Sequence, residues 1–159
     1  RGKVPGEVAG DLALDDTGTM VGALASLGEV VVFNASNGVV IGRSALDGFR
    51  GGGLIIDKGI AYIAGKDSKV RAYSPRNDRM LWESKLDGVA MSAPAVTRNR
   101  VYVGTDVGAV VCLDIKTGRE CWRIDAGSPV FASPVIVANR CVAASTDGDV
   151  IGLIISADD

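Results

Sequence analysis

The stretch from Arg100 to Asp125 decides the fold, and it reads RVYVGTDVGAVVCLDIKTGRECWRID. Apolar and polar residues alternate along it, and turn-forming residues interrupt it at 106–108 and 116–118. Short alternating segments separated by such turns are typical of antiparallel β-structure. Together with the residues just before it, the stretch predicts four strands, over 93–97, 100–105, 109–115 and 120–125. No window of the chain shows a sustained helical period.

The same pattern recurs along the chain at a spacing of about 40 residues, a period typical of propellers and solenoids. Shifting the chain by this period brings related residues into common columns: Val30, Val70, Val110 and Val150; Phe33, Tyr73, Leu113 and Leu153; Ala23, Ile63, Val103 and Ala143; the small residues Gly28, Ser68, Gly108 and Gly148; and Trp82 with Trp122. Four antiparallel strands in about 40 residues make one propeller blade. The sequence therefore predicts an all-β protein, a β-propeller built of four four-stranded antiparallel blades.

The repeats divide the chain, taken as a single domain 1–159, into the ranges 6–48, 49–88, 89–127 and 128–159. The last repeat stops at its third strand, and residues 1–5 match the end of a fourth strand. We therefore expect residues 1–5 to complete the last blade. Two arrangements remain open, a four-bladed ring and half of an eight-bladed ring.

Composition excludes several classes of function. The chain has 159 residues, 21 glycines, a net charge of −2 and no histidine. This charge gives no basic surface for a nucleic acid partner. The missing histidines remove the Ser–His and Cys–His nucleophile pairs and the commonest metal ligand. No run of eighteen apolar residues predicts a transmembrane segment. No catalytic, cofactor-binding or metal-binding residue is predicted.

One repeat carries a family pattern. Cys112, Asp114, Thr117, Gly118 and Trp122 follow the spacing A-x-D-x-x-T-G-x-x-x-W, with Cys112 in the place of the alanine. The segment resembles the blade of the quinoprotein-like (PQQ-like repeat) β-propeller family. The resemblance implies that the Trp122 indole packs between blades, against the Gly118 peptide.

The second repeat matches the pattern less well. It keeps Trp82, but Ser74, Asn77 and Asp78 replace its Asp, Thr and Gly. The resemblance thus gives Trp82, Trp122, Gly118, Asp114 and Thr117 as structural docking residues. It also predicts that Trp122→Ala destabilises the protein more than Trp82→Ala does.

The resemblance also bears on activity. Quinone-dependent members of the family hold their cofactor with calcium, an Asp base and often a disulfide of adjacent cysteines. This chain has no Cys-Cys dipeptide, and both tryptophans occupy docking positions. It is more similar to non-catalytic scaffold members such as the outer-membrane-assembly lipoprotein, which implies no cofactor. Because the family usually closes with seven or eight blades, a homodimer completing an eight-bladed ring is one hypothesis, and a half-ring from a larger protein is another.

Four polar residues in the turns between second and third strands form a candidate partner-binding mouth: Lys66, Asp67, Asp106 and Asp147. Ordinary turn chemistry explains the same residues. Gly51-Gly52-Gly53 is interpreted as a flexible entry to the second blade, and Asp15-Asp16 as a solvated turn. A disulfide between Cys112 and Cys121 is conceivable.

These observations favour a non-enzymatic β-propeller scaffold that binds a protein partner. A propeller that binds a small ligand or a quinone, as a sensor or a quinoprotein fragment, is the alternative, and a half-ring excised from a larger multidomain protein is a third. Hints about compartment oppose each other, since unpaired cysteines favour the cytoplasm and the scaffold family favours the periplasm.

Overall fold

The computed structural model describes residues 3–4, 6–8, 10 and 12–155 of the chain. It contains four antiparallel sheets, each built from strands that are consecutive in the sequence. The first sheet holds β1 (Ala13–Leu14), β2 (Met20–Ala25), β3 (Glu29–Asn34) and β4 (Val40–Ala45); the second β5 (Gly52–Asp57), β6 (Ile60–Gly65), β7 (Lys69–Ser74) and β8 (Arg79–Lys85); the third β9 (Ala95–Val96), β10 (Arg100–Gly104), β11 (Ala109–Asp114) and β12 (Glu120–Asp125); and the fourth β13 (Val135–Val137), β14 (Arg140–Ala144) and β15 (Val150–Ile154). The predicted all-β fold class is confirmed, and the four strands of the third sheet fall within the ranges predicted for them.

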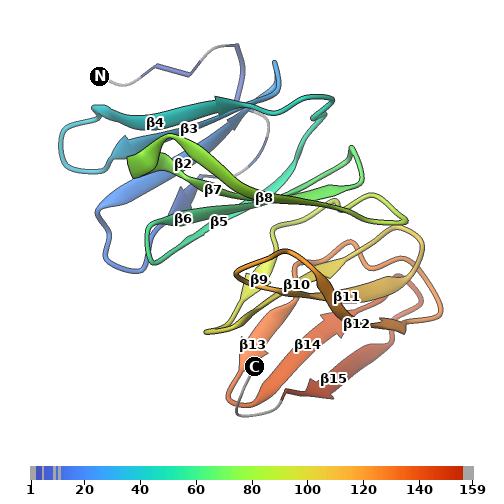
Figure 1. Ribbon diagram of the computed structural model, residues 1–159. Helices are drawn as coiled ribbons and strands as arrows, with labels where there is room; N and C mark the ends of the chain where they lie inside the picture. Colours follow the sequence, from blue (N-terminus) through green and yellow to red (C-terminus); the bar gives the residue numbers. More distant parts are fainter. Residues whose placement is uncertain (1–2, 5, 9, 11, 156–159) are drawn as a thin grey trace.

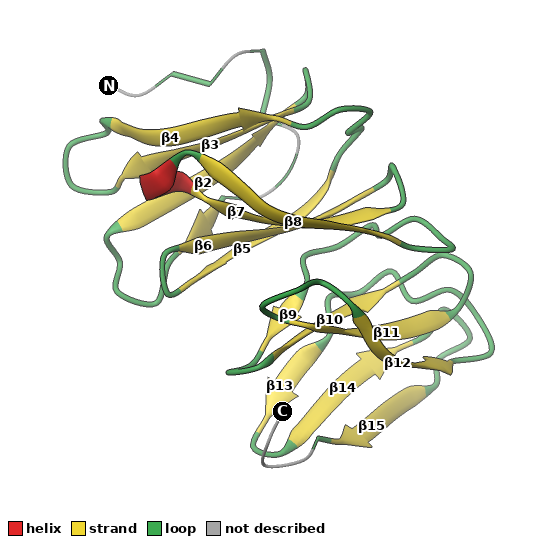
Figure 2. Ribbon diagram, viewed as in Figure 1, coloured by secondary structure: helices red, strands yellow, loops and turns green. Residues whose placement is uncertain are grey.

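The sheets follow one another as blades along an open arc, with the first and the fourth at opposite ends of the molecule (Figure 1). Figure 2 shows that strands and loops make up nearly all of it. The described helical structure is one turn of 3-10 helix, η1 (Pro75–Asn77), between β7 and β8. No helix in the part of the chain that the structure describes is long and apolar enough to cross a membrane.

The expected completion of the last blade by residues 1–5 falls mostly outside the described residues, since residues 1, 2 and 5 are not among them. Of the two described residues in this range, Val4 lines a groove on the first sheet together with Leu12 and Phe33. That groove lies at the end of the arc opposite β15 (Figure 1). Val4 therefore does not pair with the fourth sheet of its own chain.

The backbone conformation explains why one column of the repeat contains small residues. Gly28, Ser68, Gly108 and Gly148 all have positive φ, between 60° and 93°, and each donates its N–H to the carbonyl three residues earlier. Each residue thus closes the tight turn between the second and third strands of its blade. Glycine adopts this left-handed conformation without steric cost, which explains the pattern.

Apolar cores lie between neighbouring blades. The core between the first two blades joins Met20, Leu24 and Val30 to Leu54 and Ile63. Because each sheet offers apolar side chains on both faces, a blade completes its burial only by packing against the next one.

The glycine run at the start of the second blade is closely packed and is not a flexible entry. A Cβ on Gly53 would lie 1.9 Å from the backbone nitrogen of Ala93 in the third blade, and one on Gly52 would lie 2.0 Å from the Ala64 carbonyl oxygen. No side chain fits at either position. Gly53 therefore allows the backbones of the second and third blades to come into contact, and Gly52 allows close contact with β6 of its own blade.

We expect Gly53→Ala to lower the free energy of unfolding by about 1–3 kcal/mol, because the added methyl group must displace backbone atoms. Chemical denaturation measures this change. Gly152→Ala is the matched control, since a Cβ there lies 4.0 Å from the nearest atom, the end of the Arg140 side chain. Equal stability of the two variants would contradict the close contact between blades.

Asp15 is buried, although the sequence predicted a solvated turn, because the turn after β1 surrounds its carboxylate. Its Oδ1 accepts hydrogen bonds from the backbone N–H groups of Thr19 at 2.6 Å and Met20 at 2.7 Å. Its Oδ2 accepts from the hydroxyls of Thr17 at 2.5 Å and Thr19 at 3.0 Å. Burial alone would raise the pKa of Asp15, but the hydrogen bonds from Thr17, Met20 and Thr19 outweigh it and lower the pKa from 3.8 to about 2.

This lowered pKa predicts a specific pH dependence of stability. A carboxyl whose pKa is lower in the folded state stabilises the fold above its unfolded pKa, and that contribution is lost as the pH falls toward the folded value. We expect Asp15→Asn to be less stable than the parent chain at pH 7, and the difference to shrink between about pH 4 and pH 2. Urea denaturation across this range measures it. The exposed neighbour gives the control Asp16→Asn, and an equal effect of both substitutions would contradict the assignment.

Candidate functional site

The tryptophan docking site joins the second and third blades. The Trp82 indole is 8% exposed, and its Nε1–H donates a hydrogen bond of 2.9 Å to the carbonyl oxygen of Ile115 in the next blade. A Cβ on Gly118 would lie 2.5 Å from a carbon of the Trp82 ring, so the ring lies directly on the Gly118 peptide. The Ser84 hydroxyl donates to the Gly118 carbonyl oxygen at 2.5 Å.

This contact corrects one implication of the family pattern. Gly118 receives Trp82 of the preceding blade, and not Trp122 of its own blade. Trp122 is half-buried, and the centroid of its ring lies 5.8 Å from that of Tyr102. It packs in the core that contains Cys141 and Ile155 of the fourth blade. Each tryptophan therefore packs forward onto the following blade.

Asp114 and Thr117 shape the turn that presents Gly118. Asp114 Oδ1 accepts from the backbone N–H of Lys116 and from both the N–H and the hydroxyl of Thr117, at 2.7–3.1 Å. The hydrogen bond from the Thr117 hydroxyl, together with those from the backbone N–H groups of Thr117 and Lys116, lowers the pKa of Asp114. Gly118 follows with φ of 71°, which glycine tolerates best. These two residues therefore have a structural role in the turn.

The four mouth candidates have different surroundings. Lys66 is exposed and lines a cavity, and Asp147 is exposed in its turn. Asp106 Oδ1 accepts a hydrogen bond of 2.8 Å from the backbone N–H of Val89, and Asp67 is buried in an ion pair. Lys66 and Asp147 are thus exposed to solvent, whereas Asp67 and Asp106 bind groups of the same chain, Arg71 and the Val89 N–H.

The ion pair of Asp67 was not foreseen from the sequence. Arg71 is 1% exposed; its Nη2 donates to Asp67 at 2.5 Å and to the Asp47 carbonyl oxygen at 3.1 Å, and its Nε donates to Glu83 at 2.8 Å. The hydrogen bond from Lys69, with the added charge of Arg71, lowers the pKa of Glu83. A sequence signal existed, since Arg71 is the charged member of a column that otherwise holds Val31, Val111 and Ile151.

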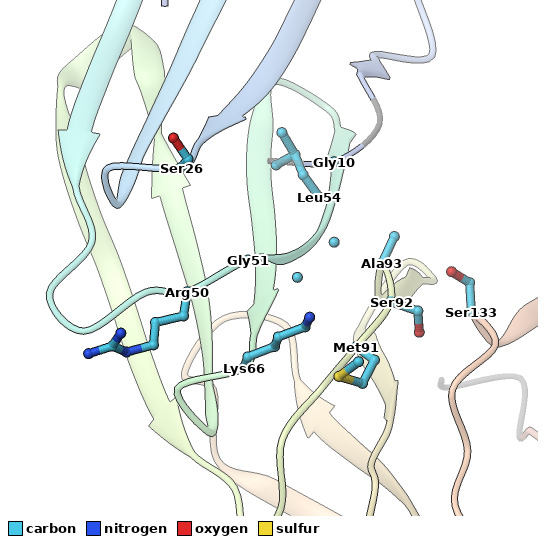
Figure 3. A pocket seen from close by; sticks show the side chains of 12 residues that line it. Gly10, Ser26, Arg50, Gly51, Leu54, Lys66, Met91, Ser92, Ala93 and Ser133 are labelled. Atoms are coloured by element: carbon cyan, nitrogen blue, oxygen red, sulfur yellow. The ribbon is translucent and has the colours of Figure 1, made fainter. Parts of the chain in front are cut away.

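A cavity lies where the segments leading into the four blades converge (Figure 3). Its volume is about 620 Å³, within the range of ligand pockets. The lining residues come from all four repeats: Gly10, Ser26, Arg50, Gly51, Gly52, Gly53, Leu54, Lys66, Met91, Ser92, Ala93 and Ser133. We call it the inner pocket, because first strands line the central channel of a propeller.

The inner pocket is positively charged. Arg50 and Lys66 both line it and both are exposed, whereas no aspartate or glutamate is among the lining residues. Hydroxyl groups of Ser26, Ser92 and Ser133 add polar atoms. Figure 3 shows the Lys66 side chain pointing toward the loop of Met91, Ser92 and Ala93, whereas the Arg50 side chain points away from this loop. Such a lining attracts anionic groups.

The residues present do not fit a calcium-bound quinone. Calcium needs several oxygen ligands, usually including carboxylates, and the inner pocket offers no carboxylate. Among the described residues, no group of three or more His, Cys, Asp or Glu side chains could hold a metal ion. The conceivable disulfide is not formed, since Cys112, Cys121 and Cys141 are all thiols. Burial raises the pKa of the Cys141 thiol to about 11, which makes it a poor nucleophile.

Comparison with solved structures identifies related folds. BamB from Moraxella catarrhalis matches with a TM-score of 0.81 and 17% identity, over 94% of this chain and 50% of BamB. Two computationally designed proteins also match: Ika4, with a TM-score of 0.72 and 22% identity over 98% of this chain and 100% of Ika4, and Ika8, with a TM-score of 0.72 and 25% identity over 90% of this chain and 45% of Ika8. This chain therefore spans about half the length of BamB.

No curated protein matches the chain. The family model described as outer membrane protein assembly factor BamB matches residues 66–159. This range covers more than half of the sequence and contains the docking pattern from Cys112 to Trp122. The chain therefore belongs to the family of the outer membrane protein assembly factor BamB, among the β-propellers with PQQ-like repeats.

Proposed function

We propose that the chain is a non-enzymatic scaffold module that binds a segment of a partner protein. The observation that carries the proposal is the match of residues 66–159 to the family of an assembly factor. The absence of histidine supports the proposal of a non-enzymatic module. The described cysteines are free thiols, and the chain has no imidazole that could act as a general base toward them.

We further propose that the inner pocket is the binding site and that it takes an extended acidic peptide segment. Lys66 points toward the opposite wall of the pocket and Arg50 adds a second positive charge at its lining, and no lining carboxylate offsets them. The hydroxyl groups of Ser26, Ser92 and Ser133 offer hydrogen bonds to a peptide backbone. A volume of about 620 Å³ accommodates several residues of an extended peptide.

The experiment compares three fluorescein-labelled peptides of equal length, in which serine alternates with aspartate, asparagine or lysine. Fluorescence anisotropy at low and at physiological salt measures their binding to the 159-residue chain. We expect the acidic peptide to bind most tightly, and its affinity to fall as salt increases. Arg50→Gln with Lys66→Gln should weaken it by about tenfold or more, the effect of roughly 1.4 kcal/mol.

The matched control is Arg43→Gln with Lys58→Gln. It removes the same two charges from side chains that are 65% and 66% exposed and do not line the inner pocket. Equal weakening by the control would mean that only net charge matters. Equal binding of the three peptides would contradict the proposal that the inner pocket selects acidic segments.

A small organic anion is the second candidate ligand, and the size and charge of the same pocket favour it. Pyrroloquinoline quinone, which carries carboxylates, is a suitable probe. Its absorbance spectrum in the presence of the protein, with and without calcium, tests this candidate. Because no carboxylate lines the pocket, we expect calcium to leave any binding unchanged.

A further inference from the structure

The inner pocket has a large apolar side chain on the wall toward which Lys66 points. Met91 is 39% exposed and lines the pocket together with Ser92 and Ala93, which follow it in the segment leading into β9 (Figure 3). This segment belongs to the third blade, which packs through apolar cores against a neighbouring blade on each side. The exposure of Met91 is therefore a property of the pocket itself. Ligand pockets combine such apolar side chains with a few polar or charged groups.

Backbone hydrogen bonds hold Lys66 and Met91 at the two walls. The Lys66 N–H donates a hydrogen bond of 2.9 Å to the Gly51 carbonyl oxygen. The Ala90 N–H donates one of 3.2 Å to the Gly65 carbonyl oxygen, so the residue just before Met91 is bound to the residue just before Lys66. A cationic group of the second blade and an apolar side chain of the third blade consequently line one pocket in a defined arrangement.

The acidic residue next to Lys66 does not offset its charge. The Asp67 side chain is only 7% exposed, and it accepts a hydrogen bond of 2.5 Å from the Arg71 guanidinium. Because this ion pair is internal, the negative charge of Asp67 is already compensated by Arg71. The exposed Lys66 ammonium is therefore available to a negatively charged group of a ligand.

We propose that the segment bound by the inner pocket alternates acidic and large apolar residues. Successive side chains of an extended chain point to opposite sides. The acidic side chains then face the positively charged lining of Lys66 and Arg50, while the apolar ones contact Met91. The flexible thioether side chain of methionine adapts to apolar groups of different shape. The inference rests on the proposed function, because it names a second feature of the acidic segment that the pocket binds.

Three further fluorescein-labelled peptides of equal length test the proposal. The first alternates aspartate with serine, the second has leucine in place of its two central serines, and the third has the same leucines but asparagine in place of each aspartate. Fluorescence anisotropy measures their binding to the 159-residue chain. We expect the second peptide to bind about tenfold more tightly than the first, because leucine is removed from water at Met91. The third should bind about tenfold more weakly than the second, because it lacks the carboxylates.

Met91→Ser tests which side chain causes the gain from leucine. We expect the variant to reduce this gain to about twofold or less, and to keep its affinity for the first peptide within about twofold of the parent chain. A general disturbance of the pocket would instead weaken the binding of the first peptide as well. The matched control is Leu81→Ser on β8, where the side chain is also 39% exposed but does not line the inner pocket. Circular dichroism verifies that both variants are folded.

The possible outcomes separate this inference from the proposed function. If the first peptide bound the chain and leucine added no affinity, the inference would be overturned while the acidic-peptide site remained. The same holds if the gain from leucine persisted in Met91→Ser, or if Leu81→Ser removed it equally. If the third peptide bound as tightly as the second, the preference for acidic segments would fail, and this inference would fail with it.

Discussion

Arg71→Val is expected to lower the free energy of unfolding by about 3–5 kcal/mol, the effect of leaving a buried charge without its partner. Asp67 loses the guanidinium at 2.5 Å, and its side chain is only 7% exposed. The Asp47 carbonyl oxygen of the first blade loses its hydrogen bond as well. Glu83 is affected less, because it is 42% exposed and keeps Lys69 at 2.7 Å. Urea denaturation followed by tryptophan fluorescence measures the change.

The double variant Asp67→Val with Arg71→Val should recover most of this loss. The first and third blades hold apolar pairs at the corresponding positions, Leu27 with Val31 and Val107 with Val111. Among the described residues, Asp67 Oδ1 and Arg71 Nη1 are buried without a hydrogen-bond partner, so the pair is only partly satisfied. Replacing both members of a buried ion pair by apolar residues is often neutral or stabilising.

A surface pair provides the comparison for Arg71. Arg43 lies 3.9 Å from Glu29 and its side chain is 65% exposed. Arg43→Val should change the free energy of unfolding by less than about 1 kcal/mol. If Arg71→Val were equally mild, or if the double variant were no more stable than Arg71→Val, the buried pair would not have the role assigned to it.

Trp82→Ala is the second substitution with a large expected effect, a loss of about 3–5 kcal/mol. The indole fills the contact between the second and third blades and donates a hydrogen bond to the Ile115 carbonyl oxygen. Trp82→Phe keeps an aromatic ring but leaves that buried acceptor unpaired, so it should cost about 1–3 kcal/mol. Thermal and urea denaturation measure both variants.

Leu81→Ala is the control for Trp82, because Leu81 is the neighbouring residue on β8 and is 39% exposed. It should cost well under half as much as Trp82→Ala. We also expect Trp122→Ala to cost less than Trp82→Ala, because Trp122 is only half-buried in this chain. This order is the reverse of the one that the family pattern predicts. A larger loss for Trp122→Ala would show that the fit of the pattern matters more than burial.

The blades could be predicted from the sequence because their signals are local. A strand needs alternating residues and a turn needs its small or polar residue, and both recur within each repeat. The 116–118 turn and the left-handed column of Gly28 and Ser68 are of this type. The residue that a given tryptophan contacts could not be predicted, because the pattern describes one blade and the contact lies between two.

The inner pocket could not be predicted for a related reason. Arg50 and Lys66 belong to the second repeat and Ser133 to the fourth, and they come together only where the arc brings its blades into one place. The burial of Asp15 depends on how Thr17, Thr19 and Met20 surround one carboxylate, and the sequence of this turn resembles that of a solvated turn. The buried ion pair of Arg71 was not predicted, although Arg71 is the charged residue in a column that is otherwise apolar.

The forward docking of Trp82 has a consequence for how the chain loses its structure. Each blade completes the core of its predecessor, so stability is shared between nearest neighbours along the chain, as in a one-dimensional Ising system. A weakened boundary in the middle then uncouples two pairs of blades, whereas a weakened end only frays. Hydrogen exchange in the Trp82→Ala chain should reveal this division, with the two halves of the arc opening independently where the parent chain opens as one cooperative unit.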